Sequence, residues 1–232
     1  MFKKQQWIKA IVYRFYSVLI TFIISYIFTG NLLVSLSIGL IDSLVKIFSY
    51  YAFDEIWDHF TKLKIKPGVV FLTGLSGSGK TTLARSVIEK LQKKGLTPVL
   101  LDGDEIRNAI KLTGFDEDSR KRHNLNVGYM AKILESQGKI VIVSLISPYA
   151  DIRDQIRAMC GRFIEVHVST DISVCMQRDT KGLYEKALKG EIKEFTGVSA
   201  PYFPPTAPEL VIDTGIFSLE EGTQKIIKAL QS

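Results

Sequence analysis

The feature that most limits how this chain can fold is the segment Gly74–Thr82, which reads Gly-Leu-Ser-Gly-Ser-Gly-Lys-Thr-Thr. An apolar run of strand length at 69–73 precedes it, and a helical pattern that continues to Lys94 follows it. A strand, a glycine-rich loop ending in Gly-Lys-Thr and a helix together form a phosphate-binding loop. The glycines let backbone N–H groups wrap the phosphates, and the helix N-terminus adds a partial positive charge. The segment therefore predicts a nucleotide-binding α/β domain.

We expect every residue of this loop to contact the nucleotide. Lys80 would neutralise the β- and γ-phosphates, and the Thr81 hydroxyl can ligate Mg²⁺. The expected nucleotide-binding residues are Gly74, Leu75, Ser76, Gly77, Ser78, Gly79, Lys80, Thr81 and Thr82.

A pair of carboxylates, Asp102 and Asp104, follows the next apolar run at 97–101. A carboxylate beside the phosphate loop can ligate Mg²⁺ through water or accept a hydroxyl proton. The alternative role is an N-cap of the following helix, which is common for Asp at such a junction. One residue of the pair can serve each purpose.

The rest of the second half alternates strand and helix patterns, as a parallel sheet flanked by helices requires. Further strands are expected at 140–145, 163–168 and 210–212, and Ser218 with Glu221 predicts a capping box before the last helix. About 165 residues is the size of a small nucleotide kinase, and the base-reading Asn-Lys-x-Asp motif of GTPases is absent. A P-loop kinase is therefore the expected fold.

The first 66 residues have a different composition, because 39 of them are hydrophobic. No charged residue occurs over the 27 positions Phe15–Ile41, with Gly30-Asn31 near the middle. The second half of this region, Leu32–Phe53, carries Asp42 and Lys46, which one helical turn places on the same side. About 20 apolar residues span a bilayer. The pattern predicts a transmembrane helical hairpin.

The distribution of charge predicts the orientation of this hairpin. Lys and Arg flank both ends and are absent from the turn, so the positive-inside rule places both termini in the cytoplasm, at a plasma or inner membrane. Tyr50, Tyr51 and Trp57 suit an interfacial belt. The alternatives are a cleaved signal peptide, which lacks a clear cleavage site here, and a buried hairpin of a soluble domain.

The same region resembles an uncharacterised bacterial family of two-helix membrane proteins. The similar segments are 23–30, 37–39 and Lys46 with Tyr50-Tyr51, within residues 5–60. This resemblance implies membrane anchoring.

From Val69 onward the chain resembles the adenylylsulfate kinase family. It carries Asp102-Gly103-Asp104 with Arg107, Gly114-Phe115, Arg120 and Ile146-Ser147-Pro148-Tyr149. The most specific stretch is Arg178-Asp179-Thr180-Lys181-Gly182-Leu183-Tyr184, followed by Phe195-Thr196-Gly197. The resemblance covers nearly all of residues 69–215.

This resemblance implies phosphoryl transfer from ATP, with Mg²⁺, to the 3′-hydroxyl of adenylylsulfate. Asp104 would orient or deprotonate that hydroxyl, and Phe115 would stack on its adenine. The implied substrate-binding residues are Arg107, Phe115, Arg120, Ile146, Lys181, Gly182 and Leu183. In the family Ser147 is sometimes assigned as a phosphoserine intermediate, and its alternative role is to cap a helix starting at Pro148.

Residues 178–205 are rich in Lys, Gly and Pro, so we expect a mobile lid that closes over phosphates. The alternative is a solvated surface excursion.

The chain departs from the family pattern between Arg122 and Asn126. The family usually has Glu, Asn and two Arg where this chain has Arg122, His123, Leu125 and Asn126. An isolated His is more often a surface or capping residue. Because these changes lie where the acceptor should bind, a kinase of the same fold acting on another nucleotide- or sugar-linked acceptor is the main alternative. A non-catalytic nucleotide-binding membrane regulator is the third hypothesis.

The expected organisation is a membrane hairpin at 1–61, a linker at 62–68 and a kinase domain at 69–232. Residues 67–232 carry a net charge of only +2, from 22 basic and 20 acidic residues, and show no basic stripe, which argues against a nucleic-acid partner. The resemblance implies a homodimer. Cys160 and Cys175 are expected to be reduced and buried.

Overall fold

The computed structural model describes the backbone of residues 4–61, 65–112 and 114–232, and side chains over 16–53, 65–112 and 114–232. Within it the chain forms two compact units, Met1–Lys62 and Leu63–Ser232. Trp57 and the basic residues expected to flank the hairpin at positions 3 to 14, 62 and 64 lie outside the described side chains.

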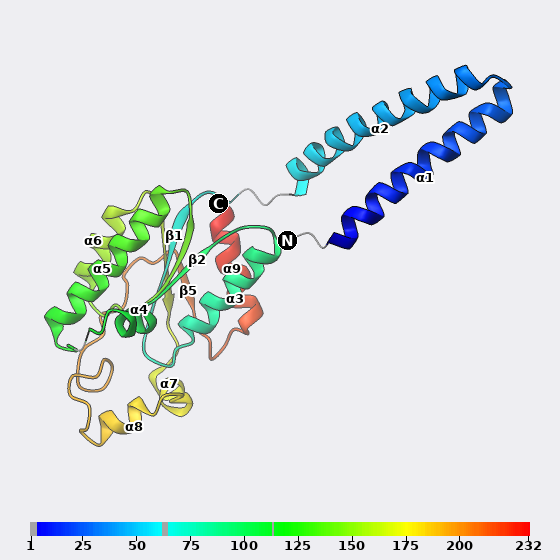
Figure 1. Ribbon diagram of the computed structural model, residues 1–232. Coiled ribbons are helices and arrows are strands. Elements are labelled where there is room, and N and C mark those ends of the chain that lie inside the picture. Colours follow the sequence, from blue (N-terminus) through cyan, green and yellow to red (C-terminus); the bar gives the residue numbers. More distant parts are fainter. Residues whose placement is uncertain (1–3, 62–64, 113) are drawn as a thin grey trace. The chain divides into compact units, whose positions relative to one another are not determined.

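The first unit is a helical hairpin of α1 (Lys4–Thr29) and α2 (Leu32–Thr61), as the uncharged run predicts (Figure 1). The turn lies at the expected Gly30-Asn31. Gly30 adopts a φ of 63°, a conformation that favours glycine, and the Asn31 side chain caps α2 by accepting from the Leu33 N–H at 3.0 Å. The polar groups of the turn are therefore largely satisfied within the hairpin.

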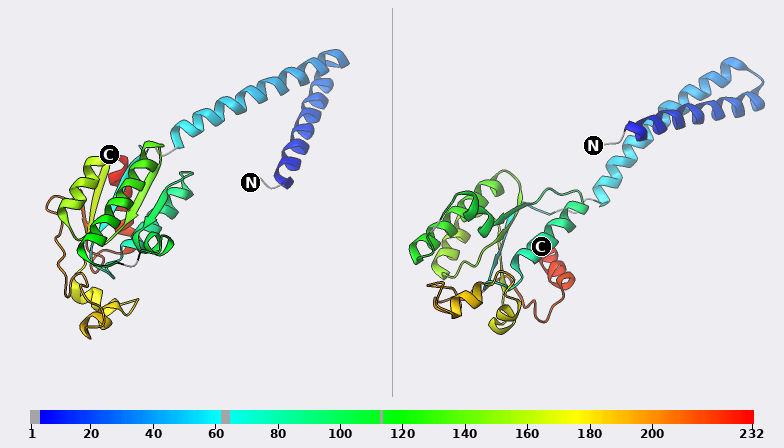
Figure 2. Two further views of the ribbon diagram at one scale, coloured as in Figure 1. Left: turned by 60° about the vertical axis from the view of Figure 1, so that its left-hand side comes forward. Right: turned by 60° about the horizontal axis from the view of Figure 1, so that its bottom comes forward.

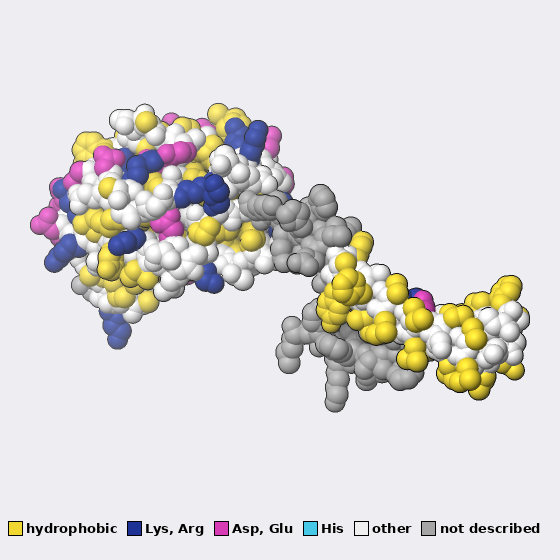
Figure 3. All heavy atoms as spheres, turned by 90° about the horizontal axis from the view of Figure 1, so that it is seen from above, with side chains coloured by type: hydrophobic (Ala, Val, Ile, Leu, Met, Phe, Trp, Pro, Cys, Tyr) yellow, Lys and Arg dark blue, Asp and Glu magenta, His cyan; other side chains and the backbone are white. Residues whose placement is uncertain are grey.

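The described surface of the hairpin is mostly apolar (Figure 3). In α2 the run Leu32–Phe53 is long and apolar enough to cross a membrane by length and composition, whereas α1 contributes the shorter segment Tyr16–Thr29. Asp42 and Lys46 form the expected ion pair at 2.7 Å. The Asp42 carboxylate also accepts from a hydroxyl group of α1, and the Lys46 ammonium donates to another, so these charged groups join the two helices.

The second unit contains a five-stranded parallel sheet of order β2-β3-β1-β4-β5. Its strands are β1 (Gly68–Thr73), β2 (Val99–Asp102), β3 (Ile140–Ser144), β4 (Phe163–Val168) and β5 (Leu210–Ile212). The order of strands along the chain is as predicted, and β2 begins and ends slightly later than expected. Every residue of β1 is buried, as in a central strand covered on both faces.

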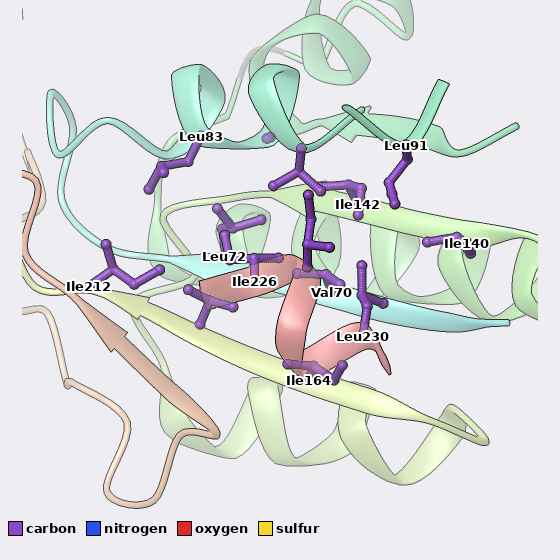
Figure 4. Packing of buried hydrophobic residues seen from close by; sticks show 14 of the residues in the cluster. Val70, Leu72, Leu83, Leu91, Ile140, Ile142, Ile164, Ile212, Ile226 and Leu230 are labelled. Carbon is purple, nitrogen blue, oxygen red and sulfur yellow. The ribbon is translucent and has the colours of Figure 1, made fainter. Parts of the chain in front are cut away.

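Helices cover both faces of this sheet (Figures 1 and 2). The helices of this unit are α3 (Lys80–Lys93), α4 (Gly103–Ala109), α5 (Glu117–Ser136), α6 (Ala150–Met159), α7 (Ile172–Arg178), α8 (Leu183–Leu188) and α9 (Leu219–Gln231). Alternate residues of β1 face opposite layers. Val70 and Leu72 pack in the α3 and α9 layer (Figure 4), and Phe71 packs in the α5 and α6 layer. Because all five strands are parallel, their carboxyl ends meet at one edge of the sheet, where α7 and α8 also lie (Figure 1).

Candidate nucleotide and acceptor site

The phosphate loop joins β1 to α3, as predicted. Gly77 and Gly79 have φ values of 74° and 94°. A Cβ at Gly77 would lie 3.0 Å from the Cys175 carbonyl oxygen, and one at Gly79 would lie 3.1 Å from the Thr214 methyl carbon. Among the described residues no side chain caps the N-terminus of α3. The loop therefore has both the backbone conformation and the uncapped N–H groups that a bound phosphate requires.

Lys80 is the buried cation of this loop. Its Nζ donates to the Leu75 carbonyl at 2.7 Å. Burial lowers the pKa of Lys80 to about 8, and the negative charges of Asp104 and Asp102 oppose that shift. A phosphate would add a further negative charge beside it and favour the charged form.

Asp102 ends β2 and caps α4, because its Oδ1 accepts from the Asp104 and Glu105 N–H groups at 3.0 and 3.3 Å. This confirms the capping role that the sequence left as one of two alternatives. Its other oxygen accepts from the Thr81 hydroxyl at 2.8 Å, and the Ser144 hydroxyl lies 3.2 Å from Thr81.

These oxygen atoms fit a magnesium ion held mainly by its nucleotide. Mg²⁺ is usually bound through one or two protein oxygens together with substrate phosphates. Thr81 and Asp102 supply such oxygens next to the phosphate loop. In the described part of the chain no three His, Cys, Asp or Glu side chains cluster as a protein-only metal cage would need.

Asp104 contacts the lid. It forms an ion pair with Lys181 at 2.5 Å, and both side chains are more than half exposed. Gly182, which follows Lys181, has a φ of 62° and precedes α8. The expected acceptor-side carboxylate and lid cation are thus in contact.

The predicted acceptor residues Arg107, Phe115 and Arg120 come from α4, from the loop that follows it and from α5 respectively. The Arg107 guanidinium lies 4.6 Å from the Phe115 ring centroid, and the ring is 58 % exposed. Burial lowers the pKa of Arg107, and the Asp104 charge opposes this shift. Arg120 donates to the Thr196 hydroxyl at 2.8 Å and to the Glu194 carbonyl, so it connects α5 to the lid.

Ile146 and Ser147 follow β3 at the same edge. Ser147 has a φ of 44° and is 1 % exposed, and its Oγ has no hydrogen-bond partner among the described residues. The capping role considered for Ser147 is wrong, because α6 begins at Ala150 and its N-cap is Tyr149, which makes no side-chain cap.

His123 is neither a surface nor a capping residue. It is 3 % exposed, and its Nε2 lies 3.0 Å from the Gly103 carbonyl oxygen. Burial lowers the pKa of His123, and the positive charge of Arg107 acts in the same direction. Its Nδ1 has no partner in the described part of the chain, and neither has the amide nitrogen of Asn124. The segment that departs from the family pattern therefore contacts, through His123, the backbone of the residue before Asp104.

The lid has more structure than its composition indicates. Helix α8 and the returning chain have a small core of Cys175, Tyr184, Ala187 and Phe195. Tyr184 donates to the Ser76 carbonyl at 2.9 Å, which attaches the lid to the phosphate loop. Cys175 is buried as expected, whereas Cys160 is only partly buried, and both are free thiols.

Sequence reasoning did not assign Tyr184, Phe195 and Thr196 to the site, although all three belong to the motifs that carried the resemblance. In the structure the Tyr184 hydroxyl lies 2.9 Å from the Ser76 carbonyl oxygen, and the ring centroids of Phe195 and Tyr184 lie 5.0 Å apart. The Thr196 hydroxyl lies 2.8 Å from the Arg120 guanidinium. Sequence reasoning also missed Arg153, whose guanidinium donates a hydrogen bond to the loop after β3. No spacing rule indicated these contacts, because the partners are distant in sequence.

Comparison with known proteins gives two matching families. Residues 66–213 match the family described as adenylylsulphate kinase, and residues 7–58 match one described as a predicted membrane protein (DUF2061). The adenylyl-sulfate kinase of Rippkaea orientalis is 46 % identical over 163 residues, which cover 70 % of this chain and 90 % of that protein. The adenylyl-sulfate kinase of Bacillus pumilus is 46 % identical over 165 residues, covering 70 % of this chain and 84 % of that protein.

Solved structures show the same similarity. The Mycobacterium tuberculosis APS kinase in complex with AMPPNP and APS aligns with a TM-score of 0.69 and 37 % identity, over 72 % of this chain and 99 % of that one. A hexameric APS kinase from Thiobacillus denitrificans aligns with a TM-score of 0.54 and 33 % identity, over 70 % of this chain and 28 % of that one.

Proposed function

Because this chain belongs to the adenylylsulfate kinase family, we propose that it transfers the γ-phosphoryl group of ATP to the 3′-hydroxyl of adenylylsulfate while its hairpin holds it at a membrane. The observation that carries the catalytic part is the Asp104–Lys181 ion pair. It brings an acceptor-side carboxylate and a lid cation together beside the phosphate loop, where both could act on one substrate.

On the ATP side, Lys80 and the N–H groups at the start of α3 bind the phosphates and stabilise the charge of the transferring group. Thr81 and Asp102 would hold Mg²⁺, which supplies further positive charge when bound. The remaining loop residues position the triphosphate through their backbone. We base these roles on the hydrogen bond from Thr81 to Asp102 and on the burial of Lys80.

On the acceptor side, Asp104 orients the 3′-hydroxyl and accepts its proton. Phe115 offers an exposed ring on which adenine can stack, and Arg107 and Arg120 supply positive charge for the sulfate and phosphate groups. Lys181 with Gly182 and Leu183 brings the lid against both substrates. Because Lys181 already pairs with Asp104, substrate entry must exchange that contact for new ones.

A coupled ADP-release assay on the full chain tests this function. We expect turnover with adenylylsulfate, and loss of at least 100-fold in kcat for Asp104→Asn, as removal of a general base commonly causes. The matched control is Glu105→Gln, since Glu105 is the next residue of α4 and, within the described residues, its carboxylate pairs with exposed Arg85 alone, at 2.9 Å. Equal losses in both variants would contradict the role of Asp104.

A different acceptor remains the second candidate, because buried His123 stands where the family usually has Asn. The same assay run with a panel of nucleotides and nucleotide sugars tests it. Turnover with another acceptor and none with adenylylsulfate would replace the proposed substrate while keeping the kinase reaction.

The membrane part of the proposal rests on the hairpin. The apolar run of α2 covers 22 residues, or about 33 Å at 1.5 Å per residue, against a hydrocarbon core of about 30 Å. We propose that both termini and the kinase unit face the cytoplasm and that the enzyme forms a homodimer. Fractionation of the full chain should leave it in membranes after a high-salt wash, and a chain starting at Lys66 should be soluble. Release of the full chain by salt alone would contradict insertion.

A further inference from the structure

A buried guanidinium group joins the acceptor side of the site to the end of the lid. Arg153 of α6 is 2 % exposed. Its Nε donates to Glu165 at 2.9 Å, one Nη donates to the Ser147 carbonyl at 2.7 Å, and the other donates to the Phe203 carbonyl at 2.8 Å. A buried charge needs a carboxylate and further hydrogen bonds of this kind. Two of the acceptors, however, are backbone groups of loops that the proposed function uses.

The first of these loops is held in an uncommon conformation. Ser147 has a φ of 44°, which is unfavourable for residues other than glycine and persists only where the surrounding structure fixes it. The Thr73 hydroxyl also donates to the Ile146 and Ser147 carbonyls, at 2.6 and 3.3 Å. The backbone next to the proposed acceptor pocket is thus fixed by donors from α6 and β1.

The second loop is the end of the returning lid. The Phe203 N–H donates to the Pro148 carbonyl at 2.9 Å, and the Tyr202 hydroxyl lies 3.0 Å from the Thr73 hydroxyl. Arg153 therefore bonds to both sides of a backbone contact that already joins the lid to the loop after β3. Removing its guanidinium would leave the contact with a single backbone hydrogen bond.

We infer that Arg153 is a positioning residue for the acceptor, which fixes the Ile146–Ser147 backbone against the end of the lid so that pocket and lid are arranged together. This rests on the proposed function for the identity of the acceptor. Arg153 lies on the acceptor side and bonds no residue of the phosphate loop in the described part of the chain. Its loss should accordingly affect acceptor binding more than ATP binding.

The chain offers a matched control one helical turn away. Arg157 of α6 also pairs with Glu165, at 3.1 Å, and with Glu209, but it bonds neither loop carbonyl among the described contacts. A lysine carries the charge of arginine without its planar fork of donors. Arg153→Lys should therefore retain a cation near Glu165 while losing at least one loop carbonyl. Arg157→Lys changes the ion pairs with Glu165 and Glu209 and the contact of the guanidinium with the Phe163 ring, and none of these involves the two loops.

Steady-state kinetics of the full chain test the inference. We expect Arg153→Lys to raise the KM for adenylylsulfate at least tenfold, a factor that corresponds to about 1.4 kcal/mol, and to change the KM for ATP by less than about twofold. Arg157→Lys should leave both constants within about twofold. Equal effects of Arg153→Lys on both KM values, or no effect on either in a folded variant, would overturn the inference.

Two further measurements do not depend on turnover with adenylylsulfate. Trypsin should cleave the lid of Arg153→Lys at least fivefold faster than that of Arg157→Lys, and equal rates would overturn the link between Arg153 and the lid. Hydrogen exchange can be measured on the wild type alone, so its result does not depend on whether a variant folds. The Phe203 amide and the amides of Ile146, Ser147, Tyr149 and Ala150 should open at one common rate, and independent exchange would contradict a shared unit. If the wild type does not use adenylylsulfate, the proposed function fails while these two tests still apply.

Discussion

Substitution of Asp102 separates a structural role from a catalytic one. One of its carboxylate oxygens caps α4 by accepting from the Asp104 and Glu105 N–H groups, and the other accepts from the Thr81 hydroxyl. Asn is as good an N-cap as Asp but carries no negative charge. Asp102→Asn therefore retains the cap and removes the charge, whereas Asp102→Ala removes both.

The structure gives the expected size of each effect. Loss of the cap in Asp102→Ala should lower the free energy of unfolding by about 1 kcal/mol. In both variants the partly buried Thr81 hydroxyl loses its carboxylate acceptor and can turn to Ser144, 3.2 Å away. Asp102→Asn keeps the cap, so its loss should stay below about 1 kcal/mol. Activity should fall in both variants, because neither retains the carboxylate that would hold Mg²⁺.

Urea unfolding and a magnesium titration of ADP release measure the two effects. We expect Asp102→Asn to unfold close to the wild type but to need at least tenfold more Mg²⁺ for half-maximal rate, a factor that corresponds to about 1.4 kcal/mol. If Asp102→Asn had the stability and the magnesium dependence of the wild type, Asp102 would be only a helix cap. If it were as unstable as Asp102→Ala, the capping argument would be refuted.

Three other predictions follow from local features. Because the pKa of Lys80 is about 8 and a bound phosphate favours its charged form, the Kd for ATP should rise by up to about tenfold per pH unit above pH 8, and calorimetry should detect proton uptake there. A pH-independent Kd would contradict this. Gly128→Ala should cost about 1–3 kcal/mol in urea unfolding, since the added Cβ would lie 2.6 Å from Ile156, and its combination with Ile156→Ala should lose less stability than the two single losses added together. Asp42→Leu should reduce the hairpin's retention in washed membranes more than Asp42→Leu with Lys46→Leu, because the single change leaves an unpaired charge in apolar surroundings; the reverse order would contradict the pairing.

The parts of the fold that could be predicted depend on residues near one another in sequence. The phosphate loop, the strand at 163–168, the Ser218 capping box and the hairpin turn at Gly30 each follow from a few adjacent side chains, and the structure confirms them. The ion pair of Asp42 with Lys46 likewise needs only the helical repeat. Local preference and tertiary structure agree at these positions.

The remainder depends on contacts between distant segments. Nothing near Arg153 in sequence indicates that it bonds the carbonyl of Phe203, and nothing near His123 indicates that α5 buries it against Gly103. The apolar residues of the lid, such as Tyr184, are too widely spaced to show a period, so their small core was not expected. The φ of 44° at Ser147 was likewise not predictable, because this conformation has no sequence pattern outside glycine.

The sequence separation between contacting segments determines when each unit can form during synthesis. The hairpin is joined by residues less than thirty positions apart, such as Ser17 with Lys46, whereas β1 pairs Gly68 with Ile140 and Val69 with Phe163. A ribosome adds about 5–20 residues per second, so the partners of β1 emerge roughly 4–20 seconds after it. With the hairpin as a membrane anchor, the nascent chain would be attached before its sheet can close. The kinase unit would then fold while the chain is already held at the membrane.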